Sequence, residues 1–181
     1  MEALSRLEMA LQKQEQILCK ALHTDLGKSK TESVMCEIGL VQGEIRWMKQ
    51  HLGRLCRQKH VRTPLAQFAA KSYQSPSPYG NVLIMSPWNY PVLLTLEPLV
   101  DAIAAGNTAV VKPSAYAPAS ANVLKDLLEE CFPSEYVAVV LGGREENQAL
   151  LQEKFDKIFF TGSAAVGKQV MESAARHLTP V

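Results

Sequence analysis

The first third of the chain repeats apolar residues with the period of an α-helix. In the first segment the repeat ends just before Gly27, a residue type that often terminates helices. In the second segment steps of four and three alternate, and Ser29 with Glu32 three residues later suits a capping box at its start. The pattern therefore predicts two amphipathic helices. Their apolar stripes are Leu4, Leu7, Leu11, Leu18 and Leu22 in the first, and Val34, Ile38, Val41, Ile45, Met48, Leu52 and Leu55 in the second.

Two uses of the second stripe fit the sequence. Its roughly three heptads are enough for a short coiled-coil seam, which would make the stripe an oligomerisation surface. However, Gly39, Gly43 and Gly53 lower its helix propensity. We therefore expect the stripe to pack on the core of the same chain, with the oligomerisation surface as the alternative.

Residues 56–79 are basic at first and then rich in proline and serine, ending in SYQSPSPYG. Such residues favour turns and extended backbone over helix. Because Phe68 and Tyr73 would gain free energy by being covered, we predict an extended segment that crosses the body of the protein, not a flexible linker.

From Gly80 onward the pattern changes to short apolar runs separated by helix-like stretches. Runs of Val, Ile and Phe with little polar interruption are typical of parallel strands that are buried on both faces. The pattern predicts an α/β fold, a Rossmann-like doubly wound parallel sheet that follows an N-terminal helical arm. We place the arm and crossing segment at residues 1–75 and the α/β domain at 76–181. The strands are NVLIM, TAVV, YVAVV and KIFF, and the helices span 92–105, 114–131, 145–154 and 163–178.

Charge and cysteine content narrow the class of protein. Residues 1–75 hold 12 Lys/Arg and 7 Asp/Glu, whereas residues 76–181 hold 7 and 11. Opposite net charges suit two regions that pack on each other or on a partner, and the interleaved acids argue against a nucleic-acid partner. The four cysteines lack metal-ligand or CxxC spacing, so we expect no metal site, and buried or partly buried free thiols in a reducing, cytoplasmic setting.

The N-terminal segment and the apolar runs of the chain give no targeting signal. The N-terminal MEALSRLEMALQKQ has acids and glutamines where a signal peptide has a basic segment and an apolar core. No run reaches the roughly 18 apolar residues of a membrane span, so we expect a soluble protein with no membrane segment in this chain.

Polar clusters follow each predicted strand, where ligands gather in open α/β sheets. After the first strand, PWNYP places Asn89 between Pro87 and Pro91, whose rings restrict the backbone. A fixed side-chain amide suits an oxyanion site, but Asn is equally suited to cap a helix that begins near Pro91. The local pattern leaves both roles open.

Two further clusters also have two interpretations each. Lys112 ends the second strand before a proline, where its ammonium could contact a ribose or phosphate, or could simply be exposed. In FFTGSAAVGK, Gly162 and Ser163 precede a helix whose first N–H groups could bind a phosphate. Ser163 could equally be an ordinary helix cap.

Taken together and in this order, these motifs resemble the aldehyde dehydrogenase superfamily. The matching segments are PWNYP, LEPLVDAIAAGNTAVVKPS, FFTGSAAVGK and HLTPV, and the resemblance extends from the first helix to the last residue. The compact N-terminal arm, KPS and HLTPV most resemble the class 3 and fatty aldehyde dehydrogenase branch.

The resemblance implies NAD- or NADP-dependent oxidation of an aldehyde to a carboxylic acid. A cysteine thiolate forms a thiohemiacetal, hydride passes to the nicotinamide, and a glutamate activates water. By position, Asn89 is the oxyanion donor and Lys112 contacts the adenosine ribose. The remaining cofactor-binding positions are Ser86, Pro87 and Trp88 in the cleft, and Phe160, Thr161, Gly162, Ser163, Ala164, Ala165, Val166 and Gly167 in the pyrophosphate turn.

The resemblance also suggests partners. Trp88 and Tyr90 indicate an apolar aliphatic or aromatic aldehyde, and the family is compatible with a homodimer of the full-length enzyme. Family members often have glutamate where this chain has Ala115. Without that carboxylate a 2′-phosphate meets no repulsion, so we expect NADP to be tolerated.

The general-base glutamate and the nucleophilic cysteine of the family follow HLTPV, beyond Val181. The resemblance therefore implies that the sheet is incomplete and that residues 76–181 are an NAD(P)-binding domain truncated at its C-terminal end. We expect this chain alone to be an inactive and poorly soluble N-terminal part of such an enzyme, because an open parallel sheet edge invites aggregation. The alternative is a non-catalytic nucleotide-binding or interaction protein that retains the fold.

Overall fold

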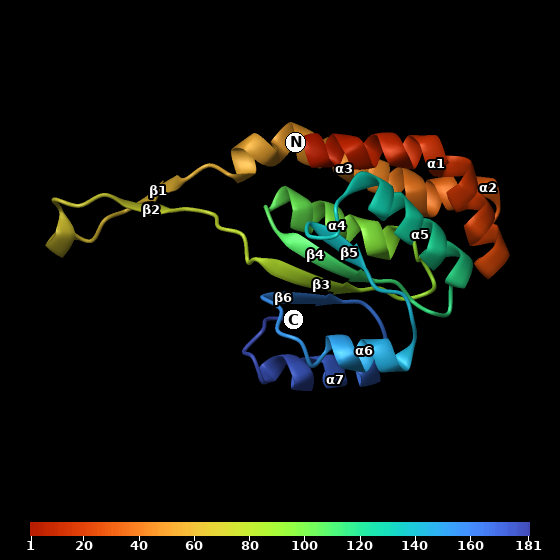
Figure 1. Cartoon of the computed structure of the whole chain (residues 1–181). Coiled ribbons are helices and arrows are strands. Elements are labelled where there is room, and N and C mark those ends of the chain that lie inside the picture. The colour runs from red at the N-terminus through yellow and green to blue at the C-terminus, as the bar shows by residue number, and fades with distance from the viewer.

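A parallel sheet forms the centre of the computed structural model, which describes residues 1–181 (Figure 1). The four strands lie in the order β5-β4-β3-β6 and all pair in parallel. Apolar side chains of these strands are buried by helices on both faces, as the nearly continuous apolar runs predicted. The strands are β3 (Asn81–Met85), β4 (Thr108–Lys112), β5 (Val137–Val139) and β6 (Lys157–Phe160).

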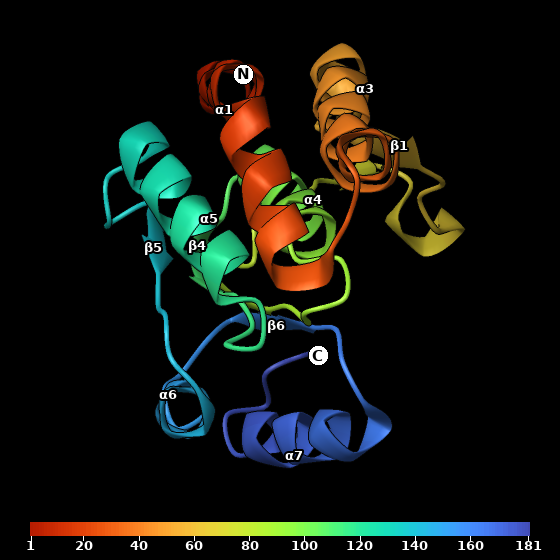
Figure 2. The same cartoon turned by 90° about the vertical axis from the view of Figure 1, so that its right-hand side faces the viewer.

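Helices cover the two faces of the sheet in the order of a doubly wound fold. Figure 2 shows α4 (Leu93–Ala104) and α5 (Pro118–Cys131) on one face, and α6 (Arg144–Leu150) and α7 (Ala164–Ala175) on the other. The chain proceeds outward from β3 to β5 and then returns to the other side of β3. The strand order therefore reverses between β3 and β6, the position where such folds bind ligands.

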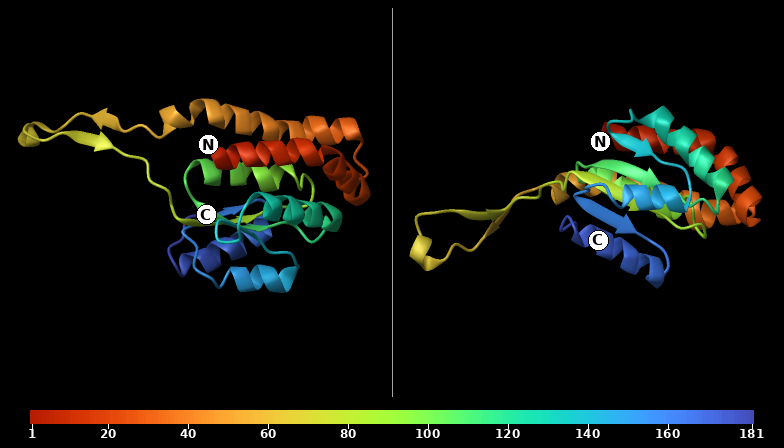
Figure 3. Two further views of the ribbon diagram at one scale, coloured as in Figure 1. Left: turned by 45° about the horizontal axis from the view of Figure 1, so that its top comes forward. Right: turned by 60° about the horizontal axis from the view of Figure 1, so that its bottom comes forward.

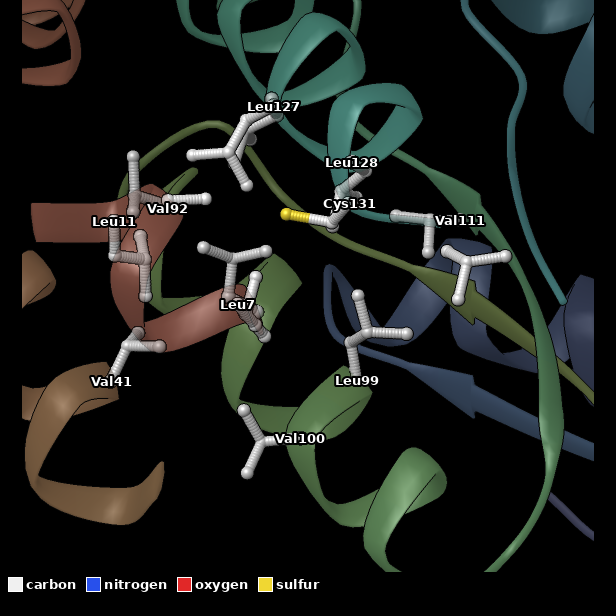
Figure 4. Close-up of a cluster of buried hydrophobic side chains, with 14 of the residues drawn as sticks. Leu7, Leu11, Val41, Val92, Leu99, Val100, Val111, Leu127, Leu128 and Cys131 are labelled. Carbon is white, nitrogen blue, oxygen red and sulfur yellow. The ribbon is translucent and has the colours of Figure 1, made fainter. Parts of the chain in front are cut away.

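The N-terminal helices form a further layer on α4 and α5 (Figures 1 and 2). Leu7 and Leu11 lie between side chains of α3, α4 and α5 in the main hydrophobic cluster, and the cluster also includes Cys131 (Figure 4). Both predicted helices are confirmed, and Gly27 ends the first with φ 67° and a hydrogen bond to the His23 carbonyl. The helices are α1 (Glu2–Leu26), α2 (Lys30–Ser33) and α3 (Gly39–Leu55).

The second apolar stripe packs on the core of this chain. Ile38, Val41 and Ile45 are fully buried and Met48 nearly so, which leaves little of the stripe for an oligomer interface. Only Leu55 at its end is substantially exposed, at 45%.

The second helix departs from the regular α-helix that the sequence predicted. Its residues Val34–Ile38 form a π-helical turn (η1) between α2 and α3. The Gly39 N–H donates to the Val34 carbonyl, and a Cβ at Gly39 would lie 2.7 Å from that oxygen. The glycine thus permits the wider turn, a feature often found at functional sites.

Residues 56–79 differ from the prediction of a covered crossing segment. They form an antiparallel hairpin of β1 (Lys59–Val61) and β2 (Ser72–Gln74), with a short 3₁₀ turn (η2) at Leu65–Gln67. The hairpin projects away from the body (Figure 3). Because nothing else in the chain reaches it, Phe68 is 83% and Tyr73 56% exposed, and the prediction that they are covered is wrong.

All four cysteines are free thiols, but they differ in exposure. Cys19 and Cys131 are buried and Cys36 is partly buried, whereas Cys56 is exposed, which corrects the prediction for that residue. Nowhere in the chain do three or more His, Cys, Asp or Glu side chains gather as metal ligands would. None of the helices combines the length and apolar character that crossing a membrane requires.

Candidate cofactor cleft and the Asn89 loop

A cleft of about 590 Å³ opens at the carboxyl ends of the strands, next to the point where the strand order reverses. Parallel pairing brings Met85, Lys112 and Phe160 to the same edge of the sheet, since Met85 is in register with both of the others. The strand ends, α6 and α7 together form the lining. It consists of Met85, Ser86, Lys112, Pro113, Ser114, Ala115, Tyr116, Gly142, Gly143, Arg144, Asn147, Gln148, Leu151, Phe160, Val166 and Gln169.

Lys112 is the most deeply placed charge of the cleft. It is only 3% exposed, so the alternative of an exposed lysine is wrong. Its Nζ donates to the carbonyls of Gly142 at 2.7 Å and of Pro113 at 2.9 Å. Burial lowers the pKa of this ammonium, although nearby Glu146 opposes the shift. Since an ammonium has three protons, two hydrogen bonds leave one donor for a ligand.

Glu146 occupies the amino end of α6. Its carboxylate accepts a hydrogen bond from the Gly143 N–H at 2.6 Å, an arrangement that closes the first turn of the helix. Hydrogen bonds from its own backbone N–H and that of Gly143 lower the pKa of this carboxyl group. The amino end of α6 therefore already holds a negative charge, which would repel a phosphate. A phosphate is better accommodated at the amino end of α7.

The amino end of α7 is open by comparison. The Ser163 hydroxyl accepts from the Val166 N–H at 3.4 Å, so Ser163 is the helix cap that the sequence allowed. The first-turn N–H groups of Ala164 and Ala165 have no partner within a helix of this geometry. Both residues are exposed, and the end of this helix therefore offers N–H donors beside the cleft.

Gly162 lies against the aromatic ring that lines the cleft. A Cβ at this position would approach the Phe160 ring to 2.6 Å, whereas a Cβ at Gly167 would be in ordinary contact with the same ring at 3.4 Å. Gly162 therefore lets the turn pass close to Phe160, a residue of the cleft lining.

The loop between the two prolines presents Asn89 to solvent. Ser86 is buried at its base, where its hydroxyl is hydrogen-bonded to that of Thr95. The Asn89 side chain is exposed and makes no hydrogen bond, and α4 begins only at Leu93. Helix capping by the Asn89 side chain, one of the two predicted roles, is therefore wrong.

The amino end of α4 is capped instead by a residue from the N-terminal arm. The Glu37 carboxylate accepts from the N–H groups of Val92 at 2.8 Å and Leu93 at 3.1 Å. Its other oxygen is bound by Lys28 Nζ at 2.6 Å, which also donates to the Asn89 carbonyl at 2.9 Å. Neither residue was predicted from the sequence as part of the site. The available signal was that Glu37 stands three residues after Val34 and four before Val41, on the apolar face.

The structure brings some of the predicted cofactor-binding positions together and leaves others outside the cleft. Ser86, Lys112, Phe160 and Val166 line it. Arg144, Asn147 and Gln148 of α6 line it as well and were not predicted, because α6 has no motif of its own. The predicted residues that do not line it are Pro87, Trp88, Asn89, Thr161, Gly162, Ser163, Ala164, Ala165 and Gly167.

The chain is similar along its whole length to known aldehyde dehydrogenases. A sequence model of the Aldehyde dehydrogenase family matches residues 1–181. The chain is 46% identical over 180 residues to 4,4'-diaponeurosporen-aldehyde dehydrogenase of Staphylococcus aureus, covering 99% of this chain and 39% of that protein. It is 41% identical over 181 residues to Aldehyde dehydrogenase family 3 member A2 of Rattus norvegicus, covering 100% and 37%.

Solved structures agree with the sequence comparisons. The substrate-bound state of Staphylococcus aureus AldH superposes with a TM-score of 0.97 at 46% identity, over 99% of this chain and 39% of that one. A Mycobacterium tuberculosis aldehyde dehydrogenase complexed with NAD+ superposes with a TM-score of 0.86 at 29% identity, over 98% and 36%. The chain spans about two fifths of the length of these relatives. With a family match along its whole length and the fold of solved members, the chain belongs to the aldehyde dehydrogenase family.

Proposed function

We propose that the full-length protein carrying these residues oxidises an aldehyde to a carboxylic acid with NAD or NADP. Residues 1–181 would supply the cofactor cleft and one donor of the oxyanion site. The observation that supports this most strongly is the adjacency of the two parts. The cleft begins at Met85 and Ser86, and the loop that carries Asn89 follows directly after them.

The chemistry of the cleft fits a dinucleotide. Lys112 has one free donor for a ribose hydroxyl, and the first turn of α7 has free N–H groups for a pyrophosphate. The Asn147 Oδ1, in the lining, is buried without a hydrogen-bond partner and can accept from a ligand. When bound, the nicotinamide accepts the hydride that leaves the substrate.

NADP is proposed to be tolerated along with NAD. Ala115 stands where a carboxylate would repel a 2′-phosphate, Arg144 adds a positive charge to the lining, and the nearby Glu146 carboxylate is already hydrogen-bonded to the Gly143 N–H. Turnover with NAD and none with NADP would refute this part of the proposal.

Asn89 is proposed to stabilise the negative charge that develops on the aldehyde oxygen. Its side-chain amide is exposed and makes no hydrogen bond in the protein, so its N–H is free to donate. Donors of this kind, held in place before the reaction, typically contribute about 10²- to 10³-fold to the rate. Trp88 and Tyr90, exposed on either side, favour an apolar aliphatic or aromatic aldehyde.

Residues 1–181 alone are proposed not to oxidise aldehydes. A nucleophilic thiol must reach the aldehyde, and no cysteine of this chain lines the cleft. Cys19 and Cys131 are buried in the helical layers instead. Four free thiols also support a reducing compartment such as the cytoplasm.

The hairpin of β1 and β2 is proposed to contact a second copy of the protein. A two-stranded hairpin by itself is marginally stable in water, so a partner surface is expected to cover it. Leu65 and Phe68 at its end are 88% and 83% exposed and would supply the apolar contact. This supports a homodimer of the full-length protein.

The proposed activity is tested with purified full-length protein and a set of straight-chain and aromatic aldehydes. Formation of NADH or NADPH and of the carboxylic acid is expected. The Asn89→Ala variant should lose about 100- to 1,000-fold in kcat and retain the Kd for the cofactor. Cofactor binding without oxidation of any aldehyde would favour the non-catalytic nucleotide-binding protein, and absence of both would refute the proposal.

A further inference from the structure

Lys28 and Glu37 form a buried ion pair directly behind the Asn89 loop. The pair is 2.6 Å apart, and its side chains are 8% and 0% exposed. Lys28 follows the end of α1 and reaches the loop 61 positions further along the chain. Glu37 belongs to the π-helical turn and reaches the amino end of α4 55 positions further along. Taking two charges out of water is costly, so a pair at this depth needs compensating hydrogen bonds.

The loop supplies those hydrogen bonds. Lys28 Nζ donates to the Asn89 carbonyl at 2.9 Å, and it lies 3.9 Å from the centre of the Tyr90 ring, within range of a cation–π contact. The Glu37 carboxylate accepts from Val92 and Leu93. Lys28 thus binds its partner and the backbone of the loop, and Glu37 binds its partner and the amino end of α4, which directly follows the loop.

The π-helical turn determines where the carboxylate lies. Glu37 is in this turn, and the close approach of Gly39 to Val34 that makes the turn possible leaves no room for a Cβ. The turn therefore helps to place the Glu37 carboxylate at the amino end of α4. Through its ion pair with Lys28, the same carboxylate also helps to hold the backbone of Asn89.

These contacts fix the backbone that carries the Asn89 side-chain amide. Pro87 and Pro91 restrict the backbone torsions around the loop, and Lys28 fixes the carbonyl of Asn89 itself. The side chain of Asn89 has no hydrogen bond of its own in the chain, so its direction depends on this backbone. We infer that Lys28 and Glu37 are positioning residues for Asn89, which hold its amide where the oxyanion forms. This inference rests on the proposed function.

The test uses the full-length protein and a charge-balanced double variant, Lys28→Met with Glu37→Gln. Removing both charges avoids an unpaired buried charge, and the side-chain carbonyl of the introduced glutamine can still accept from α4, so the variant is expected to fold. The carbonyl of Asn89 loses its donor. Because a small misplacement of a catalytic group costs up to about 100-fold, kcat should fall about 10- to 100-fold while the cofactor Kd stays unchanged.

A double-mutant cycle with Asn89→Ala separates positioning from a structural role. If the pair acts through Asn89, the triple variant should have the kcat of Asn89→Ala within about twofold, since coupled residues are not additive. If the Lys28/Glu37 substitutions lower kcat by the same factor in wild-type protein and in Asn89→Ala, the inference is wrong. It is also wrong if they leave the kcat of wild-type protein unchanged. Lys28→Arg, which keeps the charge but changes the donor geometry, should also lower kcat and so gives a second, charge-preserving variant.

Another ion pair of the arm provides the matched control. Lys49 and Glu8 lie 2.9 Å apart between α3 and α1, partly buried and without contact to the loop. Lys49→Met with Glu8→Gln should leave kcat unchanged. If wild-type protein oxidises no aldehyde, the proposed function fails and this inference fails with it. If wild-type protein is active, Asn89→Ala is impaired and the Lys28/Glu37 variants are not, only the inference fails.

Discussion

The Asp25 carboxylate accepts a hydrogen bond of 2.7 Å from the backbone N–H of Ser120, 95 positions away in the sequence. Its second oxygen accepts from the Ala119 N–H at 3.1 Å. Asp25 therefore caps α5, whose own N-cap residue, Ala117, has no side chain able to do so. Glu37 does the same at α4. Carboxylates of the arm therefore accept hydrogen bonds from the free backbone N–H groups at the amino ends of both helices on one face of the sheet.

Replacing Asp25 by alanine should destabilise the protein. Loss of a helix cap costs about 1–2 kcal/mol, and the negative charge at a helix amino end is lost as well. Urea denaturation followed by circular dichroism measures the change in the free energy of unfolding. Asp126→Ala is the control, because Asp126 is an exposed residue in the middle of the same helix, away from its amino end. Equal losses in the two variants would show that the cap contributes nothing.

The thiols should react with alkylating reagents in the order of their exposure. Burial raises the pKa of the Cys131 thiol to about 11, so only a small fraction is thiolate in neutral or mildly alkaline buffer, and the side chain is also covered. Cys56 is exposed and should be alkylated first. Mass spectrometry after timed iodoacetamide treatment gives the rate at each site. Alkylation of Cys131 in folded protein as fast as that of Cys56 would contradict the buried position.

Lys112→Met should weaken cofactor binding. The ammonium donates to two carbonyls and retains one proton for the ligand, and a hydrogen bond from a charged group contributes about 1.5–3 kcal/mol. The Kd for NAD, measured by isothermal titration calorimetry, should rise about 10- to 100-fold. Lys125→Met on α5, outside the cleft, should leave it unchanged. A Kd that responds equally to both substitutions would remove Lys112 from the cofactor site.

Gly162→Ala should impair cofactor binding more than Gly167→Ala. The new methyl group would come within 2.6 Å of the Phe160 ring and force that ring to move, whereas at Gly167 the distance is 3.4 Å. Because Phe160 lines the cleft, its displacement should raise the Kd for NAD several-fold in the first variant only. The same titration measures both, with the melting temperatures as a check on folding. A larger effect at Gly167 would contradict the steric argument.

Leu65→Ser with Phe68→Ser should weaken the proposed dimer. Both side chains project into solvent at the end of the hairpin, so their loss removes little contact within the chain. Light scattering coupled to gel filtration of the full-length protein should show a shift toward monomer. An exposed pair on the body, Met9→Ser with Ile17→Ser, should leave the mass unchanged. A wild-type protein that is already monomeric would contradict the proposed dimer.

The sequence by itself determined the local elements and their order. Apolar residues recur along the sequence with the spacing at which a helix or a strand buries its side chains. The apolar stripe of α1, its end at Gly27 and the four parallel strands could therefore be predicted. The spacing of PWNYP, KPS and FFTGSAAVGK along the chain was sufficient to identify the family. These features depend on residues close together in sequence.

Only the tertiary structure decided which distant groups meet. The caps of α4 and α5 come from Glu37 and Asp25 because packing of the arm brings these carboxylates to the helix ends, and no local pattern encodes such a contact. Lys112 is buried because the turn after β5 closes over it, and Phe68 is exposed because its hairpin leaves the body. Burial and long-range hydrogen bonds are properties of the packed elements together. For that reason the position of Asn89 became interpretable only once Lys28 and Glu37 were seen behind it.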